Sequence, residues 1–143
     1  ILAGRRTNDG MGAYVAQRVV KLMNQRRIAV MDANVLILGL TFKENCPDLR
    51  NTRVVDIIQE FRDYNAHVEV YDPWVEPQEA LHEYGVEPIA EPKPGYYDAI
   101  ILAVAHQQFR EMGVERLRAL GKPDSVLFDV KYLFPAADVD GRL

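Results

Sequence analysis

The feature that most constrains this chain is the alternation of short apolar stretches with helical patterns. Strands are expected at residues 35–38, 67–71, 98–104 and 125–130. Helices are expected at residues 8–27, 52–64, 77–84 and 107–120. Strands that alternate with helices form a parallel sheet with right-handed crossovers and helices on both faces. We therefore expect an α/β fold built on a doubly wound parallel sheet.

Smaller features refine this expectation. Asn8 or Asp9 is expected to cap the first helix, and Gly113 is expected to break the last one. The tail from Phe134 onward is rich in Ala, Asp and Gly, so we expect it to fray.

Composition excludes several classes of protein. The 143 residues are 48% hydrophobic and 27% charged, which is typical of a globular domain that needs no disulfide or metal for stability. The longest apolar run, residues 99–105, is too short to cross a membrane. A net charge of −4 lacks the basic footprint of a nucleic-acid-binding domain. The single cysteine, Cys46, excludes an intrachain disulfide and is compatible with a reducing compartment, so we expect a cytoplasmic location.

The sequence opens without an initiator Met, at Ile1, and no apolar segment follows Arg5 and Arg6. These residues are therefore not expected to be a signal peptide, and we expect the chain to be cut from a longer protein.

Cationic side chains follow several of the expected strands. Lys43 and Arg50 lie in the segment after the first strand, His106 follows the third, and Lys131 follows the last. In an open doubly wound sheet, ligands bind beyond the carboxyl ends of the strands. These groups are therefore expected to converge on one edge, where they would suit a phosphate or pyrophosphate.

Each candidate also has a structural interpretation. The segment 40–50 is longer than the usual connection of about two to six residues, which favours a functional loop. Lys43 on its own is more often a solvated surface lysine. Arg50 could cap the following helix or pair with Asp48.

Asp72, His106 and Cys46 are open to two interpretations each. Asp72 resembles the acid that binds ribose in dinucleotide folds, but Asp-Pro after a strand is also a plain turn, which is favoured. His106 has no carboxylate or cysteine partner close in sequence, so a helix-start role is favoured over catalysis. Cys46 lies between Asn45 and Pro47 without a nearby base, which argues against a nucleophile.

Several motifs are absent. The Gly39-Leu40-Thr41-Phe42 turn lacks the second and third glycines of the dinucleotide fingerprint, so the sheet is not expected to be a primary NAD domain. The sequence contains no Walker motif, no metal-ligand spacing and no serine elbow.

Three motifs together resemble a known family. Residues 38–52 read Leu-Gly-Leu-Thr-Phe-Lys-Glu-Asn-Cys-Pro-Asp-Leu-Arg-Asn-Thr, with Gly-Leu-x-Phe-Lys followed by Arg seven residues later. Tyr71-Asp72-Pro73 and Phe128-Asp129-Val130-Lys131 follow in the family's order, with Lys131 where many members have Arg. The chain resembles the Rossmann-like C-terminal domain of the UDP-glucose/GDP-mannose dehydrogenase family. Its loop looks most like the branch that acts on UDP-N-acetylhexosamines for capsule or O-antigen synthesis.

The resemblance implies a function and a set of site residues. Members of the family oxidise the C6 alcohol of a nucleotide sugar to a carboxylate with NAD⁺, through a catalytic cysteine that lies upstream of this domain. It implies that Lys43 and Lys131 contact the UDP-sugar and that Arg50 contacts NAD. No residue of this chain inherits a catalytic role, and the chain alone is expected to be inactive. Cys46 lies outside the catalytic-cysteine context.

The resemblance also implies an organisation. Residues 1–30 would be the end of the central helical region, and residues 31–143 the UDP-sugar-binding domain. Partners would be the upstream domains and a second copy of the protein, held through the central helix. The alternative is a stand-alone sugar-nucleotide-binding or regulatory module. A receiver-like switch would need an acidic pair after the first strand, where this chain has Gly39-Leu40-Thr41.

Overall fold

A computed structural model describes residues 10–143, and the expected caps Asn8 and Asp9 lie outside that range. A five-stranded sheet forms the centre, in the order β2-β1-β3-β4-β5. The strands are β1 (Asn34–Leu38), β2 (His67–Tyr71), β3 (Tyr97–Leu102), β4 (Gly121–Asp129) and β5 (Gly141–Arg142). All four pairings between neighbouring strands are parallel, which confirms the expected fold class.

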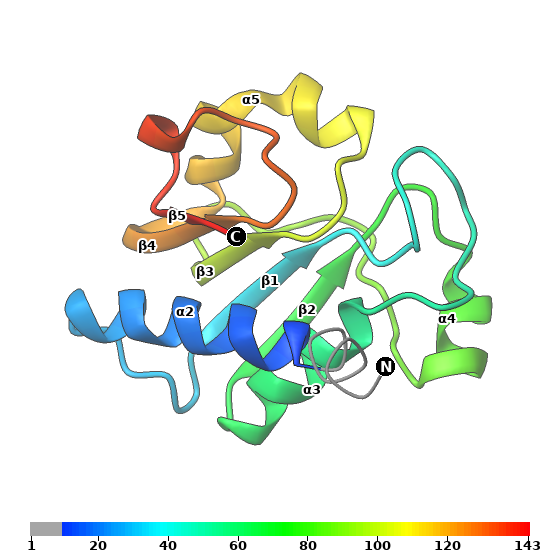
Figure 1. The fold of residues 1–143 in the computed structure, drawn as a ribbon, viewed down its shortest axis with the longest axis horizontal. Coiled ribbons are helices and arrows are strands. Elements are labelled where there is room, and N and C mark those ends of the chain that lie inside the picture. Colours follow the sequence, from blue (N-terminus) through cyan, green and yellow to red (C-terminus); the bar gives the residue numbers. More distant parts are fainter. Residues whose placement is uncertain (1–9) are drawn as a thin grey trace.

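The helices cover both faces of this sheet. They are α2 (Met11–Gln25), α3 (Val54–Asp63), α4 (Pro77–Tyr84) and α5 (Gln107–Ala119), with a short 3₁₀ turn at Ala136–Asp138. Figure 1 shows α2 and α3 on one side of the sheet and α5 on the other, with α4 beyond the edge strand β2. The expected break in α5 is confirmed, because Gly113 has φ 79° and ψ 159° inside that helix.

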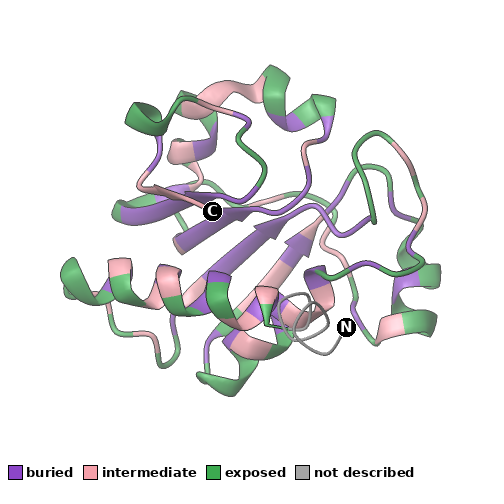
Figure 2. Ribbon diagram, in the orientation of Figure 1, coloured by how far each residue is buried: buried purple, intermediate pink, exposed green. Residues whose placement is uncertain are grey.

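The core follows from the side-chain alternation of the strands. Val35 and Ile37 of β1 pack with the cluster that includes α2 and α3. Leu36 and Leu38 face the opposite way and pack with Phe109 of α5. Because both faces of the central strands are covered, β1 is almost continuously apolar and buried (Figure 2).

Helix α2 packs closely on α3. Val15, Ala16, Val19 and Met23 of α2 are fully buried. Gly12 permits the approach, because a Cβ added there would lie 2.6 Å from the Cβ of Asp56. The first helix is therefore packed into the same body as the sheet.

The C-terminal tail differs from expectation, because it is ordered and pairs with the sheet. The Asp140 carboxylate accepts hydrogen bonds from Arg26 at 2.5 Å, from Arg118 at 3.1 Å and from the Leu127 backbone N–H at 2.8 Å. Burial opposes the ionisation of Asp140, but these bonds outweigh it and keep its pKa below the ordinary value. The expectation of fraying was wrong because the partners of Asp140, which come from the C-cap of α2, from α5 and from β4, are distant in sequence and cannot be seen in the local composition.

Within the described residues, no helix is long and apolar enough to span a bilayer.

Candidate functional site

The carboxyl ends of the strands face a small pocket of about 160 Å³. It is lined by the loop after β1, by the ends of β3 and β4, and by the beginnings of α2 and α3; Thr41, Phe42, Val104 and Lys131 are among its lining residues. This is the edge at which open parallel sheets bind ligands. The pocket therefore lies where the sequence predicts a site.

Gly39 sets the path of the loop that leaves β1. Its φ is +103°, and a Cβ added there would lie 2.5 Å from the Cβ of Val104. The backbone thus turns tightly against the segment that follows β3, and only glycine fits there without strain.

Lys43 and Lys131 are both exposed at this edge. Lys131 lines the pocket, and Lys43 follows the lining residue Phe42. Neither ammonium group forms an ion pair with a carboxylate among residues 10–143. Phe42 is 54% exposed, so a flat apolar surface lies beside the two charges. The sequence interpretation did not single out Phe42, although an aromatic residue next to a candidate lysine was a usable signal.

Arg50 lies apart from this pocket. It borders a separate hollow with Leu49, Glu79 and Tyr84, near α4. Its Nε and Nη2 atoms donate to the two oxygens of Asp48, at 3.0 and 3.1 Å. The hydrogen-bonded Arg50 guanidinium holds the pKa of the Asp48 carboxyl below its usual value. The predicted pairing of Arg50 with Asp48 is confirmed.

Asp72 is wholly inside the protein, with a side chain that is 0% exposed. Its Oδ2 accepts hydrogen bonds from the backbone N–H groups of Leu40 at 2.6 Å and Thr41 at 3.1 Å, and its Oδ1 accepts from the N–H of Trp74 at 2.8 Å. Burial opposes ionisation, but the bonds from His106, Leu40 and Trp74 outweigh burial and lower the pKa of Asp72. A ribose-binding role is excluded, and the favoured turn is only part of what this carboxylate does.

His106 has a carboxylate partner after all. Its Nε2 lies 2.9 Å from Oδ2 of Asp72, and its side chain is also 0% exposed. Its Nδ1 accepts a hydrogen bond from the backbone N–H of Asn45 at 2.9 Å. Because Nδ1 accepts, the proton is on Nε2 and points at Asp72. His106 is also the N-cap residue of α5, which confirms the helix-start expectation; its carboxylate partner, Asp72, is distant in sequence and could not be found from neighbouring residues.

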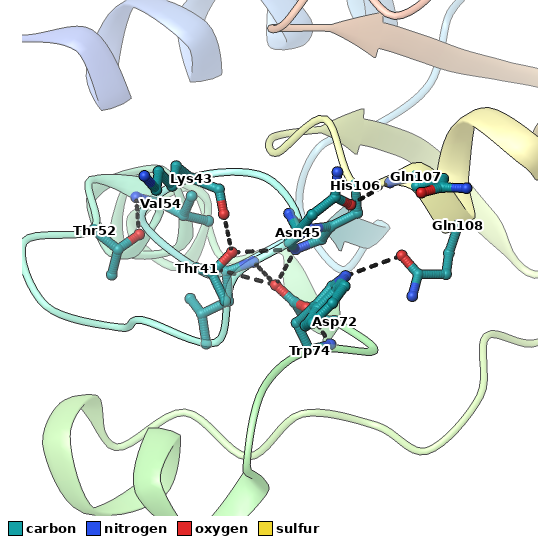
Figure 3. A network of polar contacts seen from close by, with 11 residues as sticks. Thr41, Lys43, Asn45, Thr52, Val54, Asp72, Trp74, His106, Gln107 and Gln108 are labelled. Carbon is teal, nitrogen blue, oxygen red and sulfur yellow. Dashed lines mark hydrogen bonds and ion pairs between the residues drawn. The ribbon is translucent and has the colours of Figure 1, made fainter.

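Asn45 ties the middle of the loop to the beginning of α5. Its side-chain Oδ1 accepts from the backbone N–H of Gln107 at 2.8 Å (Figure 3). Its φ is +56°, a conformation that Asn tolerates better than most residues. Asn45 was not predicted as a contact of His106, since the two are far apart in sequence.

Among the described residues, the site presents groups that can bind an anion, and its buried histidine is not available as a base. Both ring nitrogens of His106 are engaged by Asp72 and Asn45, so this histidine cannot act as a base for the half-buried Cys46. No cluster of potential metal ligands occurs among the described residues. Two ammonium groups without an ion-pair partner in the described part of the chain, together with an exposed aromatic ring, suit an anion that also carries a flat ring.

Comparison with known proteins agrees with this geometry. Residues 36–136 match the model of the UDP-glucose/GDP-mannose dehydrogenase family, UDP binding domain. The chain is 59% identical over its whole length to the UDP-N-acetyl-D-glucosamine 6-dehydrogenase of Pseudomonas aeruginosa, and 52% identical to that of Salmonella typhi. It covers 34% of each of these two relatives, so it spans about a third of their length.

Solved structures share the fold. The NDP-N-acetyl-D-galactosaminuronic acid dehydrogenase of Methanosarcina mazei superposes with a TM-score of 0.83 at 21% identity, over 96% of this chain and 28% of that one. The UDP-D-ManNAc dehydrogenase of Pyrococcus horikoshii gives 0.75 at 23% identity, over 96% of this chain and 31% of that one. These structures confirm the fold, and the family model and the two relatives confirm the resemblance seen in the loop motif.

Proposed function

Because the chain belongs to the UDP-glucose/GDP-mannose dehydrogenase family, we propose that it is the C-terminal, sugar-nucleotide-binding domain of an NAD-dependent UDP-sugar 6-dehydrogenase. The observation that carries the proposal is that Lys131 lines the pocket, that Lys43 follows the lining residue Phe42, and that neither ammonium pairs with a carboxylate of residues 10–143. A nucleoside diphosphate presents anionic oxygens to such ammonium groups. The exposed ring of Phe42 adds a surface on which a base can stack.

We propose a UDP-N-acetylhexosamine as the substrate. Two relatives that match the whole chain, at 59% and 52% identity, are named UDP-N-acetyl-D-glucosamine 6-dehydrogenases. The groups that read the sugar would lie largely outside this chain, which spans about a third of those relatives. The substrate is tested by measuring kcat/KM of the enzyme that contains this chain with UDP-N-acetylglucosamine and with UDP-glucose. A preference for UDP-glucose would contradict this assignment.

The oxidant would be NAD⁺, held mainly by another part of the enzyme. A dinucleotide fold cradles pyrophosphate with the backbone N–H groups after its first strand. Here the N–H groups of Leu40 and Thr41 are occupied by Asp72. The β1 turn therefore does not fit a dinucleotide. The contact between Arg50 and NAD stays a prediction, and it would require the guanidinium to share or release Asp48.

Partners and location complete the proposal. The remaining domains of the enzyme would close over the sheet edge that carries Lys43 and Lys131. A homodimer through the first helix would use the outer side of α2, where Tyr14 is 50% exposed, since the inner side is occupied by this domain. Sedimentation of the enzyme that contains this chain, with Tyr14→Arg as the variant, tests that contact. The cytoplasmic location stays a prediction.

The binding role is tested on the 143-residue chain by titration with UDP and UDP-N-acetylglucosamine. Half of the site would be absent, so we expect a Kd near the millimolar range, roughly 4 kcal/mol. Lys43→Ala and Lys131→Ala should each weaken binding, whereas Lys21→Ala, an exposed lysine on α2, should not. Shift changes centred on the opposite edge of the sheet would overturn the placement.

The same chain should form no NADH from either UDP-sugar, because the catalytic residues of the enzyme would lie outside it. Turnover by the chain alone would favour a self-sufficient enzyme and contradict the domain assignment. The alternative, a stand-alone binding or regulatory module, predicts that the surrounding protein lacks dehydrogenase activity as well.

A further inference from the structure

The loop that carries Lys43 has little burial to hold it in place. Thr41 and Leu49 are buried at its two ends, but Phe42, Lys43, Glu44 and Asn45 are all exposed. Apolar packing therefore cannot fix the position of the Lys43 backbone. Its position depends on hydrogen bonds that the loop makes to the rest of the domain.

Two of the loop's polar contacts meet at His106, one on each side of Lys43. On one side, the Thr41 hydroxyl donates to the Lys43 carbonyl oxygen at 2.9 Å and lies 3.2 Å from Nε2 of His106. On the other side, the Asn45 N–H donates to Nδ1 of the same ring at 2.9 Å. Figure 3 shows the imidazole between Asp72 and these two loop residues. One buried ring thus contacts the loop before and after the lysine.

The ring is itself held rigidly. Asp72 accepts from Nε2, and the ring of Phe109 lies 5.5 Å from the imidazole, centre to centre. Trp74 lies on another side at 6.3 Å. These contacts come from α5 and the turn after β2, both parts of the folded body. The imidazole can therefore hold the exposed loop in a fixed position relative to the sheet.

We propose that His106 is a positioning residue for sugar-nucleotide binding, which sets where the Lys43 ammonium stands by fixing the loop backbone at Thr41 and Asn45. The inference rests on the proposed function, because it requires Lys43 to contact the ligand. His106 itself touches no ligand, since it is wholly buried.

Two substitutions separate positioning from stability. The Asn side chain places an oxygen where Nδ1 lies, so His106→Asn keeps an acceptor for the Asn45 N–H and loses the donor to Asp72. The Gln side chain places a nitrogen where Nε2 lies, so His106→Gln keeps the donor to Asp72 and loses the Asn45 contact. If His106 acts through the loop, affinity follows the Asn45 contact, whereas Tm follows the Asp72 contact. His82→Gln, an exposed histidine on α4, is the matched control.

The experiment measures the Kd of UDP and UDP-N-acetylglucosamine for the 143-residue chain by NMR titration. His106→Gln should weaken binding about three- to tenfold, which corresponds to the loss of one hydrogen bond, and His106→Asn should change it less than about twofold. In a Lys43→Ala background the effect of His106→Gln should disappear, because nothing remains to be positioned. Amide exchange of Asn45 should be faster in His106→Gln and unchanged in His106→Asn.

The outcomes distinguish the positioning role of His106 from the proposed function of the domain. If Lys43→Ala weakens binding while His106→Gln does not, the positioning role is overturned and the proposed function survives. If Lys43→Ala has no effect, the Lys43 contact in the proposed function is overturned, and the positioning role with it. An undiminished effect of His106→Gln in the Lys43→Ala background would also overturn it, because the histidine would then act through the fold. If His106→Gln fails to fold, two measurements on His106→Asn still decide: the amide exchange rate of Asn45 and the Kd. Slow exchange with an unchanged Kd supports the positioning role. Fast exchange with an unchanged Kd overturns it.

Discussion

The Asp72→Asn substitution tests the buried hydrogen-bond network around Asp72 most directly. The amide replaces a buried carboxylate that accepts four hydrogen bonds. If its one remaining oxygen takes the Oδ2 position, it still accepts from Leu40, Thr41 and His106. Its NH₂ group then faces the Trp74 N–H, and that bond is lost. The variant should therefore fold and be less stable.

The magnitude follows from these contacts. A hydrogen bond to a charged acceptor contributes about 1.5–3 kcal/mol, and the three retained bonds become weaker, neutral ones. The hydrogen bond from the Trp74 N–H is only partly buried, which limits the additional cost. We expect the free energy of unfolding to fall by about 2–3 kcal/mol at pH 7. For a domain of this size that corresponds to a Tm lower by roughly 6–12 °C.

The assay is urea unfolding of the 143-residue chain, followed by circular dichroism and by the fluorescence of its single tryptophan, Trp74. The pKa of Asp72 is lowered on folding from an ordinary 3.8, so its ionised form stabilises the fold above that value. This stabilisation is lost as the pH falls through the lowered pKa. The stability difference between the two proteins should therefore shrink in that acid range. The exposed Asp124→Asn is the control. A difference below about 0.5 kcal/mol at pH 7, or one that persists unchanged into strong acid, would refute the reasoning.

Three further outcomes follow from other parts of the molecule. In the enzyme that contains this chain, Lys43→Ala should raise KM for the UDP-sugar roughly tenfold and Arg50→Ala should raise KM for NAD⁺ instead; equal effects on both constants would contradict that division. Asp140→Ala should lower the free energy of unfolding by about 1–3 kcal/mol. Most of this loss comes from the Leu127 N–H that is left without its acceptor, because Arg26 and Arg118 are more than a third exposed and their ion pairs contribute little. An unchanged urea midpoint would show that the tail does not depend on Asp140. Gly39→Ala should destabilise the chain by about 3 kcal/mol, because the added Cβ clashes with Val104 and the φ is positive. Urea unfolding of Gly95→Ala is the control, because Gly95 also has a positive φ but open space around it, so the comparison separates the clash from the backbone strain.

Local chemistry was enough to predict the α/β class, most of the strands and the edge at which the candidate pocket lies. The run Val35-Leu36-Ile37-Leu38 is apolar on both sides, which indicates a central strand whatever its neighbours are. The segment 40–50 was too long for an ordinary connection, and its motif carried the family resemblance. These features depend on residues close together in the chain, so they can be read without knowing the fold.

The partners of His106 were decided only by the order of the strands. In the order β2-β1-β3, strand β1 lies between the strand that precedes Asp72 and the strand that precedes His106. The loop that leaves β1 is consequently bracketed by both side chains, which are far apart in sequence. The same holds for Asp140, whose partners come from the C-cap of α2, from α5 and from β4. Periodicity determines which segments become strands and helices, but the contacts between polar groups depend on which strand ends become neighbours, and only packing in three dimensions decides that.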